Sequence, residues 1–415
     1  MSKRTQPTQI ILSFEHPARA VDSVAEAMAY GLRSHGVAVE VLTLPRDLPA
    51  LSKLQPQEVS GVISMGSLPL NARVAGKTLW EHLTCRFDVF LLDALPYDLA
   101  RVPAMSEFLL AALQDARLGL LSPEDGYRRW LQDALPVRWS YLPFGAFSRI
   151  QPFCEPVTPQ RKLCVIGTVG GELGGSPVGE SLLGLLTRHL GHRFNQHRLD
   201  ALSEALISPN AHSMPAITVC QELGWSTTEA LTQLCLPTII AVDSWVKRER
   251  RLAAVRSLAG IPCDFFGQGW RELLGEIPGF RHMGTIWHED IGLLLPYYIG
   301  VVNFDPNWSY GVHDRVYTAA ASGVCVLTNE NEALSAARPP RLATFNANRP
   351  DLAGVVHRAG WFEDFGKLHR PDAEQLSKHG WATRMAQWIG SGDTRQGERL
   401  HQEEPEDSGK RSCKL

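Results

Sequence analysis

The sequence predicts an α/β protein with two doubly wound parallel sheets. The clearest evidence is a succession of strand, loop, helix and strand, in which Ile299–Phe304 and Gly323–Thr328 are apolar runs of strand length and Asp314–Ser322 is alanine-rich. This order is typical of the βαβ unit of a parallel sheet. A similar succession opens the chain, and 415 residues exceed what one core usually holds. We therefore expect two domains of roughly 150 to 200 residues each.

The first domain is expected over residues 1–150. Gln9–Phe14 predicts a strand, Ala18–His35 an amphipathic helix and Val37–Thr43 a second strand, with Gly36 at the C-terminal end of the helix. Further strands and helices should alternate at Val59–Met65, Phe87–Asp93, Ser106–Asp115, Leu118–Ser122, Pro123–Ala134 and Trp139–Pro143. The loop after the first strand lacks the glycines of the dinucleotide-binding motif G-x-G-x-x-G.

A linker is expected at Gln151–Arg161, which contains three prolines, and a second domain at residues 151–390. The strand Lys162–Thr168 leads into a glycine-rich loop over residues 167–175, ahead of a predicted helix at Val178–Leu190. Two interpretations of this loop remain open. Its backbone at Gly167 and Thr168 could approach a diphosphate, or the loop is an ordinary flexible connection between strand and helix.

Histidines and cysteines do not form a metal-binding pattern. A helical insertion is expected near residues 188–236, and none of its histidines belongs to an H-E-x-x-H motif, so surface positions are favoured for His189, His192, His197 and His212. The eight cysteines are scattered without a C-x-x-C pair and lie mostly in apolar runs. We expect neither a structural zinc ion nor disulfides.

A basic helix is predicted over Val242–Leu258. Arg248 and Arg251 are three residues apart, so they lie on one face, which could meet a diphosphate. A solvated charged face is the alternative for most of the five basic residues, and only Arg248 is retained as a candidate.

The next strand is predicted at Cys263–Gly267 and ends in the turn Gly267-Gln-Gly-Trp270. Glycine at 267 and 269 permits a tight turn and a close approach of the backbone to a ligand. Trp270 is expected in the core rather than as a platform on which a base stacks.

The loop Asp305–Arg315 joins the carboxyl end of a predicted strand to the amino terminus of a predicted helix. Free backbone N–H groups at such a position favour an anion, for which a phosphate is suitable. His313, Asp314 and Arg315 can pair with phosphate, sugar hydroxyls or a nucleotide base. The alternative is an ordinary capped helix, with Asp314 as N-cap and Arg315 in solvent.

Several of these pieces occur together in the C-terminal half of GT-B glycosyltransferases, which the chain resembles over residues 140–390. The resemblance is closest to the CgeB-like group. It rests on the turn Gly267–Trp270, the spacer His282-Met283-Gly284, the run Arg315-Val-Tyr-Thr-Ala-Ala-Ala-Ser-Gly323 before a strand, and the segment Ser377–Arg384. It implies two Rossmann-like domains facing across a cleft. A protein of this kind would move a sugar from a nucleotide-diphosphate donor to an acceptor, with no metal and no other cofactor.

The resemblance also implies roles for particular residues. The donor-binding residues would be Gly167, Thr168, Arg248, Gly267, Gly269, His282, Met283, Gly284, Tyr310, Gly311, His313, Asp314, Arg315 and Thr318. A catalytic base would come from the first domain, where Glu15, His16 and Asp93 end predicted strands. Many GT-B proteins have glutamate where this chain has Thr318, which leaves donor preference and activity open. Two alternatives to a transferase remain: a nucleotide-sugar epimerase or hydrolase, and a catalytically inactive binding or scaffolding protein.

The composition narrows the choice of partners. A net charge of −3 and a pI near 6.5 give no electrostatic footprint for nucleic acid. No apolar stretch has the length of a signal peptide core or a membrane span, so a cytoplasmic protein is expected. The acceptor could be a glycan, a protein or a small molecule. Gly390–Leu415 is polar and charged and should be disordered.

Overall fold

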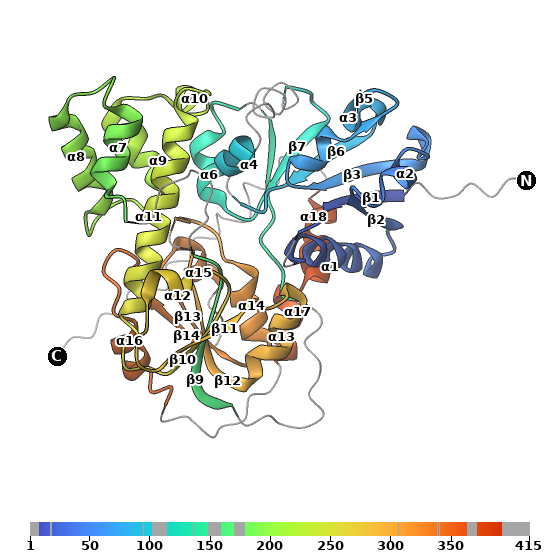
Figure 1. Cartoon of the computed structure of the whole chain (residues 1–415). Coiled ribbons are helices and arrows are strands. Elements are labelled where there is room, and N and C mark those ends of the chain that lie inside the picture. The colour runs from blue at the N-terminus through green and yellow to red at the C-terminus, as the bar shows by residue number, and fades with distance from the viewer. Residues whose placement is uncertain are drawn as a thin grey trace, which may run out of the picture.

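The protein contains two separate six-stranded sheets, each built only from parallel strands (Figure 1). The computed structural model describes residues 8–16, 19–93, 95–101, 114–135, 137–147, 159–169, 179–305, 307–337, 339, 341–362 and 372–391. The predicted α/β fold class is therefore confirmed. The linker at 151–158, most of the helix predicted at 106–115, the glycine loop from 170 to 175 and the tail from 392 onward lie outside the described residues. The domain boundaries stay a prediction.

The first sheet has the strand order β2-β1-β3-β6-β7-β8. Its strands are β1 (Thr8–Phe14), β2 (Val39–Leu44), β3 (Val59–Met65), β6 (Arg86–Phe90), β7 (Leu118–Ser122) and β8 (Arg138–Tyr141). Every residue of β7 is buried, as its continuous apolar sequence requires in a sheet covered on both faces. The helices of this half are α1 (Ala20–Ser34), α2 (Leu48–Leu51), α3 (Leu79–His82), α4 (Leu95–Arg101) and α6 (Asp125–Leu131).

Gly36 ends α1 as the sequence predicts. Its φ is +78°, and its N–H donates to Arg33 O at 3.0 Å while the next N–H, of Val37, donates to Leu32 O at 3.2 Å. These two bonds form the Schellman motif, which requires a left-handed residue at this position.

The second sheet has the order β11-β10-β9-β12-β13-β14. Its strands are β9 (Gln160–Ile166), β10 (Cys263–Phe266), β11 (Phe280–Gly284), β12 (Tyr298–Asn303), β13 (Cys325–Asn329) and β14 (Leu342–Phe345). The helices that follow its strands are α12 (Trp270–Leu274), α13 (Ile291–Leu294), α14 (Asp314–Ala321), α15 (Glu332–Ala337) and α16 (Leu352–Arg358). Trp270 is buried in this core, which confirms its predicted packing role.

A helical insertion follows the glycine-rich loop and packs beside the first sheet (Figure 1). It consists of α7 (Leu182–Leu190), α8 (Gln196–Ile207), α9 (Pro215–Leu223) and α10 (Thr227–Ala230), and it continues into the long helix α11 (Leu236–Arg256). Near its start, Leu236 and Ile240 of α11 join the apolar core under the first sheet. Near its end, Leu252 and Val255 join the core of the second sheet. One helix therefore bridges the two halves of the molecule.

Of the last two helices, α17 (Ala373–His379) packs on α14 of the second half, and α18 (Trp381–Gly390) returns to α1 beside the first sheet (Figure 1). Trp381 and Met385 of α18 belong to the same apolar cluster as Met28 of α1. A Cβ atom at Gly31 of α1 would lie 2.6 Å from the Trp381 carbonyl oxygen, so only glycine permits this close approach of α1 and α18.

His379 and Arg384 hold the segment that leaves the first sheet. His379 O accepts from Ala146 N at 2.8 Å, and Arg384 Nε donates to Phe144 O at 3.3 Å. Arg384 Nη2 also lies 3.0 Å from His379 Nδ1, and the His379 ring stacks on Tyr317 of α14. The run His379-x-Trp381-x-x-Arg384 therefore binds the segment that leaves the first sheet, and it also packs on α14 of the second half.

Acidification should weaken the contacts that His379 makes between these segments. Burial, together with the positive charges of Arg384 and Lys378, lowers the pKa of His379 to about 4. The unfolded chain binds a proton near pH 6.5, so the stability from the neutral imidazole is complete above that value and is lost as the pH falls toward 4. We expect the free energy of unfolding to fall by about 2 kcal/mol over this interval, after allowing for screening by solvent.

Urea unfolding at several pH values measures this effect against His379→Gln, which lacks the titrating group. The difference between the two proteins should shrink as the pH is lowered from 7 to 4.5. A difference that stays constant with pH would contradict the assignment.

Candidate functional site

A cavity of about 590 Å³, called the central cavity here, lies where the carboxyl ends of strands from both sheets face each other. Its first-domain wall carries His16 and Asp93 and is otherwise mainly apolar, with Phe14, Val21, Val24, Leu68, Leu92 and Phe144. Its opposite wall comes from the ends of β9 and β10 and from the start of α14. The crevice outside the carboxyl ends of parallel strands is the usual ligand position in open α/β sheets.

Arg315 lies at the base of the central cavity, in the first turn of α14. Its guanidinium donates through Nη1 to the carbonyl oxygen of Ile166, the last residue of β9, and its Nε lies 3.2 Å from His313 Nδ1. A Cβ atom at Gly167 would lie 3.2 Å from Nη1, so the arginine packs closely on this glycine. Arg315 is only 8% exposed, which rules out the alternative of an arginine in solvent.

Asp314 carries a fixed negative charge beside Arg315. Its Oδ2 lies 2.6 Å from His288 Nε2, and its Oδ1 contacts His313 Nδ1 and accepts from the Arg315 N–H at 2.8 Å. Burial alone would raise the pKa of this carboxyl, but the two imidazoles and their hydrogen bonds hold it well below its usual value. Asp314 therefore orients the two histidines at the edge of the cavity, while His313 occupies the N-cap position of α14.

The glycines of the β10–α12 turn are explained by contact with the end of β9. A Cβ atom at Gly267 would overlap Gly167 O, and one at Gly269 would overlap Val169 O; both glycines have positive φ angles. Trp270 Nε1 donates to Gly167 O at 2.6 Å and holds the two turns together. Gly267 lines the central cavity as well as a more open cavity of about 620 Å³, the outer cavity, which also contains Gly269, His282 and Gly284.

The central cavity brings together six of the predicted donor-binding residues, namely Gly167, Thr168, Gly267, His313, Asp314 and Arg315. Met283, which is exposed, lines neither cavity, and its neighbours in β11 face the outer one.

Four other predicted donor-binding residues lie away from both cavities. Arg248 is buried and pairs with Glu249 at 3.1 Å. Tyr310 packs against Tyr141 and lies under Arg129, and a Cβ atom at Gly311 would lie 2.7 Å from Pro123 O. Thr318 is buried, and its Oγ1 accepts from Phe147 N at 3.3 Å. Three of these residues, Tyr310, Gly311 and Thr318, therefore contact the first half of the molecule or the segment that leaves it.

The three candidate bases differ in position. His16 and Asp93 line the central cavity opposite Arg315, whereas Glu15 is exposed and lines neither the central nor the outer cavity. No sequence pattern distinguishes these three, because each simply follows a strand.

Several polar residues at the site were not among the sequence-based candidates. Arg251 of α11 donates through Nη1 to Thr168 O at 3.0 Å and through Nη2 to Phe304 O at 3.4 Å. His288 reaches Asp314 from the segment after β11. The spacing of three residues placed Arg251 on the same helical face as Arg248, so the sequence contained a signal for it; nothing marked His288.

Glu124 connects this site to the first sheet. Its carboxylate caps α6 by accepting from Tyr127 N at 2.7 Å, and it also accepts from Ser309 N at 3.0 Å and Tyr310 N at 2.8 Å. The loop that leads to His313 is therefore fixed by a buried acid from the other half of the molecule.

In the part of the chain that the structure describes, no group of three or more His, Cys, Asp and Glu residues could hold a metal ion. None of the helices described there has the length and apolarity to cross a membrane.

Comparison with known proteins connects this geometry to a protein class. Residues 247–390 match the family model described as "Glycosyl transferase-like". The crystal structure of sucrose-phosphate synthase from Thermosynechococcus elongatus has a TM-score of 0.50 at 12% identity, and the match covers 93% of this chain and 98% of that one. T4 phage BGT, solved with its UDP-glucose substrate, has a TM-score of 0.46 at 9% identity, covering 95% of this chain and 98% of that one. None of the curated proteins compared with the chain matches it. The chain has the GT-B fold.

Proposed function

We propose that the protein is a glycosyltransferase that takes a sugar from a nucleotide-diphosphate donor bound in the central cavity. One observation carries the proposal: Arg315 and the amino terminus of α14 lie at the base of a cavity whose other wall carries His16 and Asp93. The match of residues 247–390 to a glycosyltransferase-like family supports the same conclusion.

The chemistry requires stabilisation of the negative charge that develops on the departing diphosphate. In the first turn of α14 the backbone N–H groups of Arg315 and Val316 already donate to Asp314 Oδ1 and His313 O, which leaves the Asp314 N–H for a ligand. The Arg315 guanidinium has five N–H groups, of which Ile166 O and His313 engage two. Because these contacts hold the guanidinium in place before a donor arrives, little reorganisation is needed on binding. Side-chain and backbone donors would thus stabilise the leaving group, and we propose a metal-independent reaction on this basis.

We further propose that the base which activates the acceptor is His16 or Asp93. Both follow strands of the first sheet, β1 and β6, and line the cavity, so an acceptor hydroxyl between the walls could reach either one.

Replacing Arg315 by alanine tests the donor site. Loss of a charge-assisted contact to phosphate should weaken donor binding by about 1.5–3 kcal/mol, which is a 10- to 100-fold rise in Kd. Calorimetry with UDP-, GDP- and dTDP-sugars first identifies the donor that wild type binds, and the variant is then titrated with it.

Arg46→Ala is the control, because this arginine is exposed and lines neither cavity. Unchanged affinity in a folded Arg315→Ala protein would remove Arg315 from the donor site. Mass spectrometry of the products with added acceptors distinguishes transfer from epimerisation or hydrolysis, and binding without turnover would indicate a sugar-nucleotide-binding protein.

A further inference from the structure

A small polar chamber of about 80 Å³ adjoins the central cavity, and both are lined by Leu92, Asp93, His313 and Arg315. Unlike the central cavity, this side chamber is surrounded mainly by polar and charged groups. Its further charged residues are Asp243, Lys247, Arg251 and Asp305.

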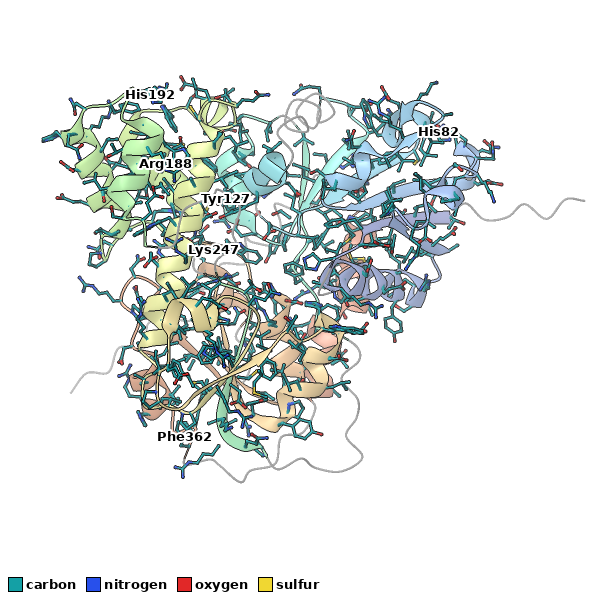
Figure 2. All side chains as sticks on the ribbon, viewed as in Figure 1. His82, Tyr127, Arg188, His192, Lys247 and Phe362 are labelled. Atoms are coloured by element: carbon teal, nitrogen blue, oxygen red, sulfur yellow. The ribbon has the colours of Figure 1, made fainter. Side chains whose placement is uncertain are left out.

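Helix α11 supplies one wall of the side chamber. Asp243, Lys247 and Arg251 are spaced by four residues, so they form one stripe along the helix, and all three line the chamber. Lys247 lies near Tyr127 of α6, at the junction of the helical insertion with the first sheet (Figure 2). Arg251, at the other end of the stripe, contacts the carbonyl of Thr168 beside Arg315. The stripe thus runs from the phosphate-facing end of the chamber toward the insertion.

Asp243 is a buried acid that is not fully hydrogen-bonded. It is 2% exposed, and its Oδ2 accepts from the Tyr97 hydroxyl. The Asn307 amide donates to its backbone oxygen at 2.8 Å. The Tyr127 hydroxyl also interacts with this carboxylate. Among the described residues no donor lies within hydrogen-bond geometry of its buried Oδ1. A buried acceptor without a hydrogen-bond donor costs free energy. Because Asp243 lines the side chamber, this cost indicates that a ligand bound there donates a hydrogen bond to Oδ1.

The covalent order of a nucleotide-sugar donor identifies that ligand. If Arg315 binds the diphosphate, as the proposed function states, the sugar lies directly beside it and the nucleoside lies on the other side. The glycine-lined outer cavity shares Gly267 with the central cavity and has room for the nucleoside. The side chamber shares Arg315 and offers carboxylate acceptors, which suit the hydroxyl donors of a sugar ring.

We propose that the side chamber binds the sugar of the donor and that Asp243 Oδ1 accepts a hydrogen bond from one of its hydroxyl groups. Asp243 is then a specificity-determining residue supplied by the helix that follows the insertion. A donor whose sugar lacks the hydroxyl leaves a buried carboxylate oxygen unpaired and binds more weakly, because such sites reject analogues without the recognised group.

The test separates the sugar from the diphosphate. Wild type and Asp243→Asn are titrated with UDP, GDP and dTDP and with the corresponding sugars, and the affinity ratio of each sugar nucleotide to its nucleoside diphosphate is compared. Asp243→Asn should lower this ratio at least 10-fold and change the Kd for the nucleoside diphosphate less than threefold. Asp264→Asn is the matched control, since Asp264 is an equally buried acid that accepts from a tyrosine, Tyr298, at 3.1 Å and lines none of the three cavities.

If Asp243→Asn changes the affinity ratio no more than Asp264→Asn does, the proposal about the sugar is overturned. The proposed donor site at Arg315 is not affected by that result. Absence of binding by wild type to any of these nucleotides would overturn the proposed function itself. If Asp243→Asn does not fold, wild type is titrated with deoxy analogues of its tightest donor. One deoxy position should then cost at least 10-fold in Kd, and equal binding of all analogues would refute the hydrogen bond.

Discussion

Replacing Trp381 by alanine should lower the free energy of unfolding by about 3–5 kcal/mol. The indole is 2% exposed and packs edge-on against Phe90 and Phe144, with ring centroids 6.0 and 6.5 Å away. A Cβ atom at Gly145 would lie 2.7 Å from the ring, so the backbone leaving the first sheet presses directly on it. Its removal leaves a large void between α18, α1 and this segment, which their backbone contacts prevent from closing.

Urea unfolding followed by circular dichroism measures the effect. Trp287→Ala serves as the control, because this tryptophan is 51% exposed and should cost less than about 1 kcal/mol. A loss below about 1 kcal/mol in Trp381→Ala would mean that α18 is not needed to hold the first sheet to the rest of the chain.

Replacing Glu124 by alanine should cost about 3 kcal/mol or more of stability, and it should also weaken donor binding. The substitution leaves the N–H groups of Ser309, Tyr310 and Tyr127 without their acceptor, and each unsatisfied buried donor costs about 1–3 kcal/mol. The loop that leads to His313 and Arg315 would lose its anchor on the first domain. The Kd of the donor should therefore rise even though Glu124 lines none of the cavities described above.

The measurements are urea unfolding and calorimetry with the best donor. Glu124→Gln keeps one acceptor oxygen and should lie between wild type and alanine in both. Exposed Glu26→Ala is the neutral control. Full stability in Glu124→Ala would show that water replaces the carboxylate and that the loop does not depend on it.

Local patterns explain why the fold could be predicted from the sequence. Apolar runs such as the one that forms β12 are buried at every residue, and the alanine-rich run that forms α14 has the period of a helix. The role of Gly36 at the end of α1 can be predicted from the residues of its own turn. These features depend on neighbours within a few residues, so a single sequence contains them.

The candidate site could be predicted only in part, because its geometry depends on contacts between distant segments. Gly167, Gly267 and Arg315 meet in the central cavity, although their roles toward a ligand stay predictions. Helical spacing could not decide between Arg248 and Arg251, since both lie on one face and only Arg251 lines a cavity. Glu124 and Ser309 are 185 residues apart, and no pattern in either segment indicates the other.

The return of α18 to α1 limits how this protein could be recombined with relatives. Because α18 completes the core of the first sheet, a chimera joined only at the connection near residue 150 would pair one parent's α1 with another parent's closing helix. The residues at positions 31 and 381 would then come from different parent proteins, and their close packing would not be preserved. Exchange of amino-terminal halves between such proteins should therefore succeed only when residues 372–391 are exchanged together with them.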